Sequence, residues 1–313
     1  MKPSMQEDSW PRIAVKGAGA VGCYFGGMLA RAGAPVTLIG RPYHIDAIAR
    51  DSLFMETSHF REQIPIAASS QLDIARNAEV VLLCVKTLDT ETAAQSLARH
   101  LPDGSVMVSM QNGVDNVERI RSAAGIAAIP AVVYVAAEMT GPGRVKHTGR
   151  GDLVIGTFSQ GDGKSELEKL RALFARAGIP CLISHNIEAE LWTKLVMNCA
   201  CNAISALSRA RYGRIVHNPW TRELMKQVTE EVITVARAAG VRLPEVDLVD
   251  AVWKLGDAMA NATSSTAQDI ARGKLTEIDS LNGYVARRGA ELNVPTPINR
   301  TLHALVKLLE EKA

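Results

Sequence analysis

A glycine-rich turn near the start of the chain constrains its fold more than any other feature. The sequence GAGAVG at Gly17–Gly22 follows a β-rich apolar run at residues 12–16 and opens a helical pattern at residues 21–32. In a G-x-G-x-x-G turn the first glycine permits a tight bend, the second lets the backbone approach a diphosphate, and the third lets the helix pack closely on the strand. Such turns also occur as plain structural turns, but this one lies between a strand and a helix. It therefore predicts a dinucleotide site formed by Gly17, Ala18, Gly19, Ala20, Val21 and Gly22.

The rest of the first half alternates strand-like and helix-like segments. Runs with the continuous apolar composition of parallel strands lie at residues 35–39, 79–85, 105–110 and 128–135. Helical patterns lie between them at residues 90–99 and 114–124. A glycine-rich stretch after Gly141 leads into Leu153–Ile155 and predicts a hairpin, followed by a helix at residues 164–177 and a strand at residues 180–183. The alternation predicts a parallel sheet with right-handed crossovers.

From Glu188 onward nearly every segment has helical periodicity. Apolar residues recur at intervals of three and four in the expected helices, which are residues 188–207, 218–239, 246–260, 277–292 and 297–311. A chain of 313 residues exceeds the size at which one core usually keeps growing. We therefore expect an α/β protein with two domains: a Rossmann-like, doubly wound parallel sheet at residues 11–185 that carries the dinucleotide site, and an all-helical domain at residues 186–313.

The residue after the second predicted strand bears on the choice of cofactor. Folds that prefer NAD place Asp or Glu there to bind the ribose hydroxyls, whereas this chain has Gly40-Arg41. The planar guanidinium of Arg41 matches a 2′-phosphate better than a hydroxyl, so NADP(H) is favoured over NAD. The alternative is an ordinary solvated surface arginine.

A polar stripe interrupts the first predicted helix of the second half. Lys194, Asn198 and Asn202 are spaced four apart and so share one helix face among apolar neighbours. Buried polar groups need partners, which are either internal hydrogen bonds or a ligand. Spacing alone leaves both readings open. A second cluster of polar residues lies at residues 264–279. It is either part of a ligand site or the result of helix capping by Thr276 or Ser280.

Taken together, these motifs resemble the ketopantoate reductase (2-dehydropantoate 2-reductase) family over nearly the whole chain. Besides the glycine turn and Arg41, the matching motifs in the family's order are CVKT at 84–87, QNGV at 111–114, KLVMN at 194–198 and SSTAQDI…TEID ending at Asp279. The resemblance implies NADPH-dependent reduction of 2-dehydropantoate to pantoate by hydride transfer, a step toward pantothenate and coenzyme A.

The resemblance also implies roles for individual residues. Lys194 matches the catalytic proton donor, and Glu277 matches a glutamate near the nicotinamide ribose and the reacting centre. Asn112 matches an asparagine that contacts both cofactor and substrate. The other implied contacts are Lys86 and Ala136 with the cofactor, and Asn198, Asn202 and Ser265 with the substrate.

Two positions depart from expectation. The family often has an asparagine where this chain has Tyr212, which makes the exact keto acid less certain than the reaction class. Lys16 occupies a strand position that is normally apolar, and it has no functional interpretation at this stage. The alternatives are a reductase of the same fold that acts on another small 2-keto or 3-hydroxy acid, and a non-catalytic NADPH-binding regulator.

Composition excludes several other classes of function. A net charge of +2 argues against nucleic-acid and membrane partners. The five cysteines include no C-x-x-C pair, and the histidines lack metal-ligand spacing, so neither a disulfide framework nor a metal site is expected. A polar start that includes Glu7 and Asp8 is no signal peptide, and a cytoplasmic location follows as an expectation. A small 2-keto acid is the expected partner. The oligomeric state is left open, a homodimer included.

Overall fold

The computed structural model describes residues 9–158 and 163–311, so the predicted polar start at Glu7 and Asp8 lies outside the described part. The chain forms two compact units. The first extends to Gln111 and resumes from Asp115 to Ile187, whereas the second comprises Asn112–Val114 and the chain from Glu188 onward. Three residues from the first half of the sequence therefore belong to the second unit.

The first unit is built on a sheet whose central strands are parallel. Strand β1 (Ile13–Lys16) pairs in parallel with β2 (Val36–Ile39) and β6 (Val80–Leu83). The parallel series extends through β7 (Val106–Ser109) on one side and β5 (Ala67–Ser69) on the other. These strands confirm the predicted parallel sheet.

A long antiparallel hairpin extends the sheet beyond β7. Its strands β8 (Ile129–Gly141) and β9 (Arg144–Ile155) confirm the predicted hairpin, and they run through the glycine-rich stretch rather than ending before it. Gly143, in the turn, has a φ of +63°, which favours glycine. The remaining strands are β3 (Leu53–Glu56), β4 (Arg61–Ile64) and β10 (Cys181–Ile183).

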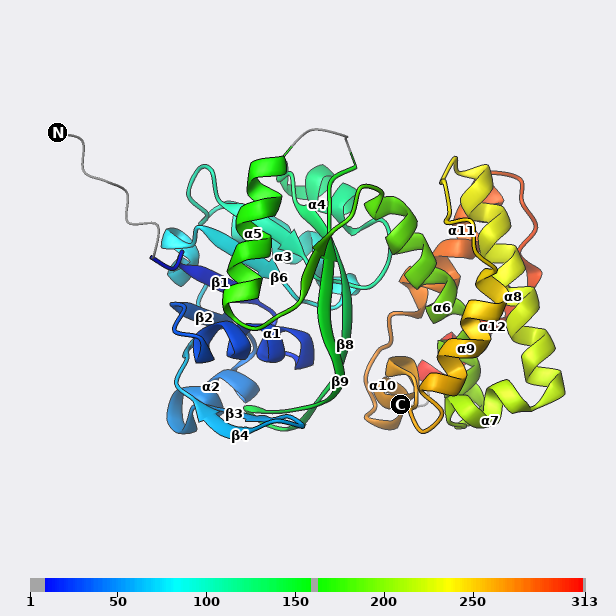
Figure 1. Ribbon diagram of the computed structural model, residues 1–313, viewed down its shortest axis with the longest axis horizontal. Coiled ribbons are helices and arrows are strands. Elements are labelled where there is room, and N and C mark those ends of the chain that lie inside the picture. Colours follow the sequence, from blue (N-terminus) through cyan, green and yellow to red (C-terminus); the bar gives the residue numbers. More distant parts are fainter. Residues whose placement is uncertain (1–8, 159–162, 312–313) are drawn as a thin grey trace. The chain divides into compact units, whose positions relative to one another are not determined.

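Helices cover both faces of this sheet (Figure 1). Alternate residues of β1 enter different cores, Val15 with α1 (Ala20–Arg31) and α5 (Lys164–Arg176), and Ala14 with α3 (Thr90–Ala98) and α4 (Asn116–Ala124). The remaining elements of this unit are helix α2 (Pro42–Asp51) and the 3₁₀ turns η1 (Asp73–Asn77) and η2 (Thr87–Asp89). The first unit is thus a doubly wound α/β domain of the Rossmann type, as predicted.

In the second unit every described element is a helix (Figure 1). Residues of the long helix α6 (Ile187–Ser208), such as Val196 and Ala200, are completely buried in the core of this unit. The other α-helices are α7 (Tyr212–His217), α8 (Pro219–Ala238), α9 (Leu248–Ala258), α10 (Ser265–Ala271), α11 (Asn282–Glu291) and α12 (Pro297–Glu310). The carboxylate of Glu231 on α8 accepts hydrogen bonds from the backbone N–H groups of Ile298 and Asn299, which fixes the start of α12.

One predicted helix is wrong as a continuous element. Residues 277–292 form the 3₁₀ turn η3 (Ile278–Ser280) and then α11, separated by Leu281, whose φ of −109° and ψ of −107° are not helical. The hydroxyl of Thr276 accepts a hydrogen bond from the Ile278 N–H at 3.2 Å and so caps the short turn. Among the described residues, no helix is long and apolar enough to cross a membrane.

Candidate active site

In the first unit, the predicted cofactor residues follow strands that end at the same edge of the sheet. Lys16, Ile39 and Leu83, the last residues of β1, β2 and β6, lie side by side in register. The turn after β1 is tied to this edge, because the Gly17 N–H donates to the Ile39 carbonyl at 2.8 Å. The carboxyl edge of a parallel sheet is where ligands bind in this class of fold.

The three glycines of the turn meet different steric demands. Gly17 has a φ of +111°, and a Cβ there would lie 2.6 Å from the carbonyl carbon of Cys84. A Cβ on Gly22 would collide with the carbonyl oxygen of Gly17. A Cβ on Gly19, by contrast, would meet no protein atom within 4 Å. Gly19 is also the N-cap of α1 and makes no side-chain cap, so the first N–H groups of that helix can receive an anion. The turn therefore fits the diphosphate of a dinucleotide.

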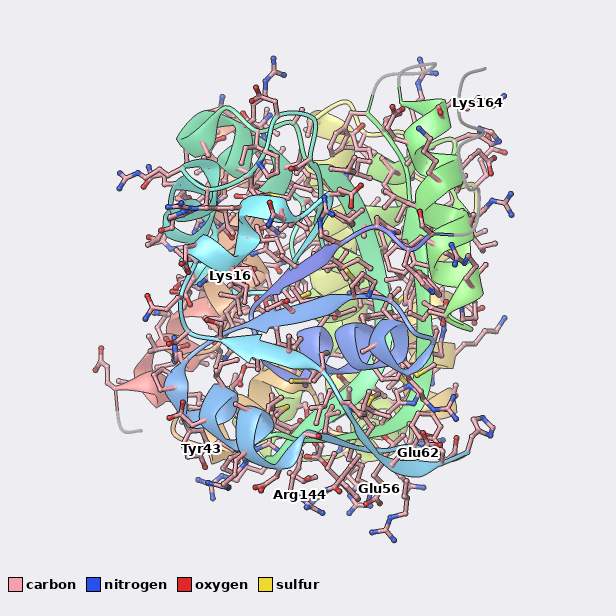
Figure 2. The ribbon with its side chains drawn as sticks, turned by 90° about the vertical axis from the view of Figure 1, so that its left-hand side faces the viewer. Lys16, Tyr43, Glu56, Glu62, Arg144 and Lys164 are labelled. Atoms are coloured by element: carbon pink, nitrogen blue, oxygen red, sulfur yellow. The ribbon has the colours of Figure 1, made fainter. Side chains whose placement is uncertain are left out.

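The side chains of Arg41 and Lys16 both interact electrostatically with the carboxylate of Asp89. The Arg41 guanidinium, at the N-cap of α2, lies 3.6 Å from the Asp89 carboxylate, and 87% of its side chain is exposed. Lys16, which Figure 2 labels, is the last residue of β1 and is half-buried. Burial lowers the pKa of its ammonium, and the negative charge of Asp89 opposes that effect. The sequence interpretation missed Asp89, because its relation to Arg41 depends on the fold.

Lys86 and Ala136 are the remaining predicted cofactor residues in this unit. Lys86 is half-buried and is the N-cap of η2, three residues beyond Leu83 at the end of β6. Ala136 lies on β8 at an irregularity of the pairing with β9, between Val135 and Ala137. Lys86 follows the same sheet edge as the glycine turn, whereas Ala136 lies six residues beyond Pro130, the last β8 residue that pairs with β7.

In the second unit, the polar stripe lies on α6. Lys194 and Asn198 are half-buried, and Asn202 is 4% exposed. Their neighbours Leu195 and Cys199 are buried in the core. The four-residue spacing on a continuous helix places the three polar side chains along one face.

A hydrogen bond joins two predicted site residues that are distant in the sequence. Asn112 Nδ2 donates to Glu277 Oε2 at 2.9 Å, across a separation of 165 residues. Asn112 belongs to the second unit although it follows β7 in the chain.

The segment that carries Glu277 is anchored to α12. Glu310 Oε1 accepts hydrogen bonds from Thr276 N at 2.8 Å and from Thr276 Oγ1 at 2.6 Å. On the other side of Glu277, the Asp279 carboxylate pairs with His303 at 2.6 Å and with Lys307 at 3.0 Å. Glu277 therefore lies between two anchored residues, which limits the positions that its backbone can take.

Ser265 is exposed at the start of α10, next to the buried Ser264, to which the sequence interpretation gave no role of its own. Ser264 caps α10 by accepting from the Ala267 N–H at 3.0 Å, and it donates to the Asn202 carbonyl at 3.0 Å. The Tyr212 hydroxyl donates to Asn202 Oδ1 at 3.2 Å. A serine just before a short helix was the signal for the cap, but its bond to Asn202 could not be read from the sequence.

The chain matches known proteins over nearly its whole length. The model of the family described as ketopantoate reductase PanE/ApbA matches residues 13–160, and the model of its C-terminal part matches residues 186–310. A 2-dehydropantoate 2-reductase from Pyrococcus abyssi is 32% identical and covers 95% of this chain and 97% of its own length.

Solved structures show the same relationship. A PanE/ApbA family ketopantoate reductase from Ralstonia eutropha JMP134 is 48% identical with a TM-score of 0.90, covering 96% of this chain and 99% of that one. A 2-dehydropantoate 2-reductase from Geobacter metallireducens GS-15 is 28% identical with a TM-score of 0.88, covering 95% and 99%. The chain belongs to the PanE/ApbA family of ketopantoate reductases.

Proposed function

We propose that this protein is an NADPH-dependent 2-dehydropantoate 2-reductase, which reduces the ketone of 2-dehydropantoate to the alcohol of pantoate. Membership of the family supports the reaction, as do the names of relatives that match over nearly their whole length. The observation that carries the proposal is the stripe of Lys194, Asn198 and Asn202 on α6, in the same unit as the bonded pair Asn112 and Glu277.

The first unit would hold the cofactor. The glycine turn and the start of α1 fit the diphosphate, and Arg41 is the group that would pair with the 2′-phosphate in place of Asp89. Lys86 and Ala136 are the further contacts. When bound, the dihydronicotinamide supplies the hydride.

Lys194 would supply the proton. Negative charge grows on the keto oxygen as its carbon is reduced, and a positioned ammonium stabilises that charge before it gives up a proton. Lys194 is half-buried on a continuous helix of 22 residues, which suits a donor that must hold one position. The role requires its Nζ to reach the keto oxygen in the ternary complex.

The remaining polar residues would orient the substrate. Asn198 and Asn202 would bind it one and two turns along α6 from the proton donor, and Ser265 would bind at the carboxylate. The hydrogen bond from Asn112 holds Glu277 at 2.9 Å, and we assign both residues to the reacting centre, where they contact cofactor and substrate.

The proposal is tested by following NADPH absorbance on addition of 2-dehydropantoate, with NADH and a panel of other 2-keto acids in parallel. Turnover should be fastest with 2-dehydropantoate and NADPH. Faster turnover with a different keto acid would contradict the proposed substrate, and faster turnover with NADH would contradict the proposed cofactor. Absence of turnover with every keto acid, in a protein that binds NADPH, would favour the regulator.

We also propose that the enzyme works in the cytoplasm, where thiols remain reduced. All five cysteines are free, and four of them are buried. Cell fractionation with antibody detection tests the location. A homodimer would have twice the chain mass of 33.7 kDa in light scattering.

A further inference from the structure

Tyr212, the position at which this chain departs from its family's pattern, lies inside the second unit rather than on its surface. Tyr212 is the first residue of α7, and it is 8% exposed. The backbone N–H groups of Tyr212 and Gly213 each donate at 3.0 Å, to the carbonyls of Ala262 and Ala260 respectively. The tyrosine is therefore held in place by the segment between α9 and α10, independently of its hydroxyl.

The Tyr212 hydroxyl makes a hydrogen bond with the amide oxygen of Asn202. It donates to Oδ1 at 3.2 Å, and Asn202 itself is 4% exposed. Burial raises the pKa of the phenol well above its ordinary value, so the hydroxyl keeps its proton across the working pH range. This contact satisfies the amide oxygen whether or not a ligand is present.

The other half of the same amide remains able to donate. Within residues 9–158 and 163–311, no group accepts a hydrogen bond from Asn202 Nδ2, and this nitrogen is not among the fully buried polar atoms that lack a partner. The backbone of Asn202 is fixed separately, because its carbonyl accepts from Ser264 Oγ at 3.0 Å. Asn202 thus presents N–H donors in a fixed orientation, because its amide oxygen is directed at the Tyr212 hydroxyl inside the protein.

We propose that Tyr212 sets substrate specificity by orienting the Asn202 amide so that its N–H donors, rather than its oxygen, meet the keto acid. This inference rests on the proposed function, because it assumes that Asn202 binds substrate. An oxygen on the substrate beyond the keto carbon would be recognised as an acceptor. When the substrate lacks that oxygen, Asn202 Oδ1 still accepts the hydrogen bond from the Tyr212 hydroxyl.

Tyr212→Phe tests this with two substrates that differ by one hydroxyl, 2-dehydropantoate and 3,3-dimethyl-2-oxobutanoate. The variant keeps the ring but leaves Asn202 Oδ1 without a donor, unless the substrate hydroxyl supplies one. The ratio of kcat/KM for the hydroxylated over the deoxy substrate should therefore rise by about tenfold, mainly through KM. The Kd for NADPH, measured by fluorescence, should change by less than about twofold. Tyr43→Phe, at an exposed tyrosine of the first unit, is the matched control.

A second variant tests the donor half of the amide. Asn202→Asp keeps an acceptor for Tyr212 but removes both N–H donors, so the ratio should fall by about tenfold. An unchanged substrate ratio in either variant, with wild type active, would overturn the inference and leave the proposed function intact. A wild type that reduces neither keto acid would overturn the proposed function itself, and this inference with it.

Discussion

Replacement of Glu310 by alanine should destabilise the second unit through the segment that carries Glu277. The Glu310 side chain is 4% exposed and accepts two hydrogen bonds from Thr276, which is itself 1% exposed. A hydrogen bond to a charged group contributes about 1.5–3 kcal/mol, and water entering the truncated site restores part of that. The ion pair with Lys307 adds about 1 kcal/mol or less, because 41% of the lysine side chain is exposed to solvent. The expected loss in the free energy of unfolding is about 2–4 kcal/mol.

The assay is thermal unfolding followed by circular dichroism at neutral pH. A loss of this size should lower Tm by roughly 3–6 °C in a chain of 313 residues, because the entropy of unfolding is about 2.1 cal/mol/K per residue. Glu311→Ala is the matched control, since it removes an exposed carboxylate one residue away, and it should shift Tm by about 1 °C or less. Equal Tm values for the two variants would refute the reasoning.

The same variant predicts a pH dependence of known sign. Burial alone would raise the pKa of Glu310, but its hydrogen bonds with Lys307 and Thr276 outweigh burial and lower that pKa from its ordinary value of 4.5. A carboxylate with a lowered pKa stabilises the folded state above its unfolded pKa, and this stabilisation is lost as pH falls through the folded pKa. The Tm difference between wild type and Glu310→Ala should therefore be full at neutral pH and shrink below about pH 4. A difference that grows on acidification would contradict it.

Three further predictions concern the proposed reaction. Lys194→Ala should lower kcat by about two decades or more while the Kd for NADPH stays nearly constant, and near-normal turnover would remove Lys194 from the mechanism. Arg41→Ala should weaken NADPH binding about tenfold or more in fluorescence titrations without changing NADH binding, because only NADPH carries the 2′-phosphate; an equal loss for both would assign Arg41 another role. Gly22→Ala should abolish binding of both cofactors, because the added Cβ would collide with the Gly17 carbonyl oxygen, and a variant that still binds NADPH tightly would show that the turn can shift.

The parts of the fold that local sequence predicts are those with a strong periodic signal. The run VVLL of β6 is buried throughout, and the glycine turn occupies its expected place after β1. Strands β3, β4 and β5 were missed, because three or four residues of mixed polarity carry no clear period. Helices α7 and α10, of six and seven residues, were missed for the same reason.

The candidate site shows the same division. The stripe on α6 follows from four-residue spacing within one helix, and the family resemblance indicated Asn112 and Glu277. Their hydrogen bond could not be predicted from spacing, since 165 residues separate them. The contacts of Asn202 with Tyr212 and Ser264 likewise depend on how three helices pack. Local sequence therefore indicates the side chains, and tertiary packing determines which of them meet.

The assignment of Asn112–Val114 to the second unit has a consequence for protein engineering. A fragment that begins at Glu188 would contain every helix from α7 to α12, but it would lack the amide that donates to Glu277. Chimaeras made by joining halves of two relatives at that point would pair Glu277 from one parent with the QNGV segment from the other. When the helical half of one relative replaces that of another, residues Asn112–Val114 of the donor should therefore be introduced into the first half of the recipient as well.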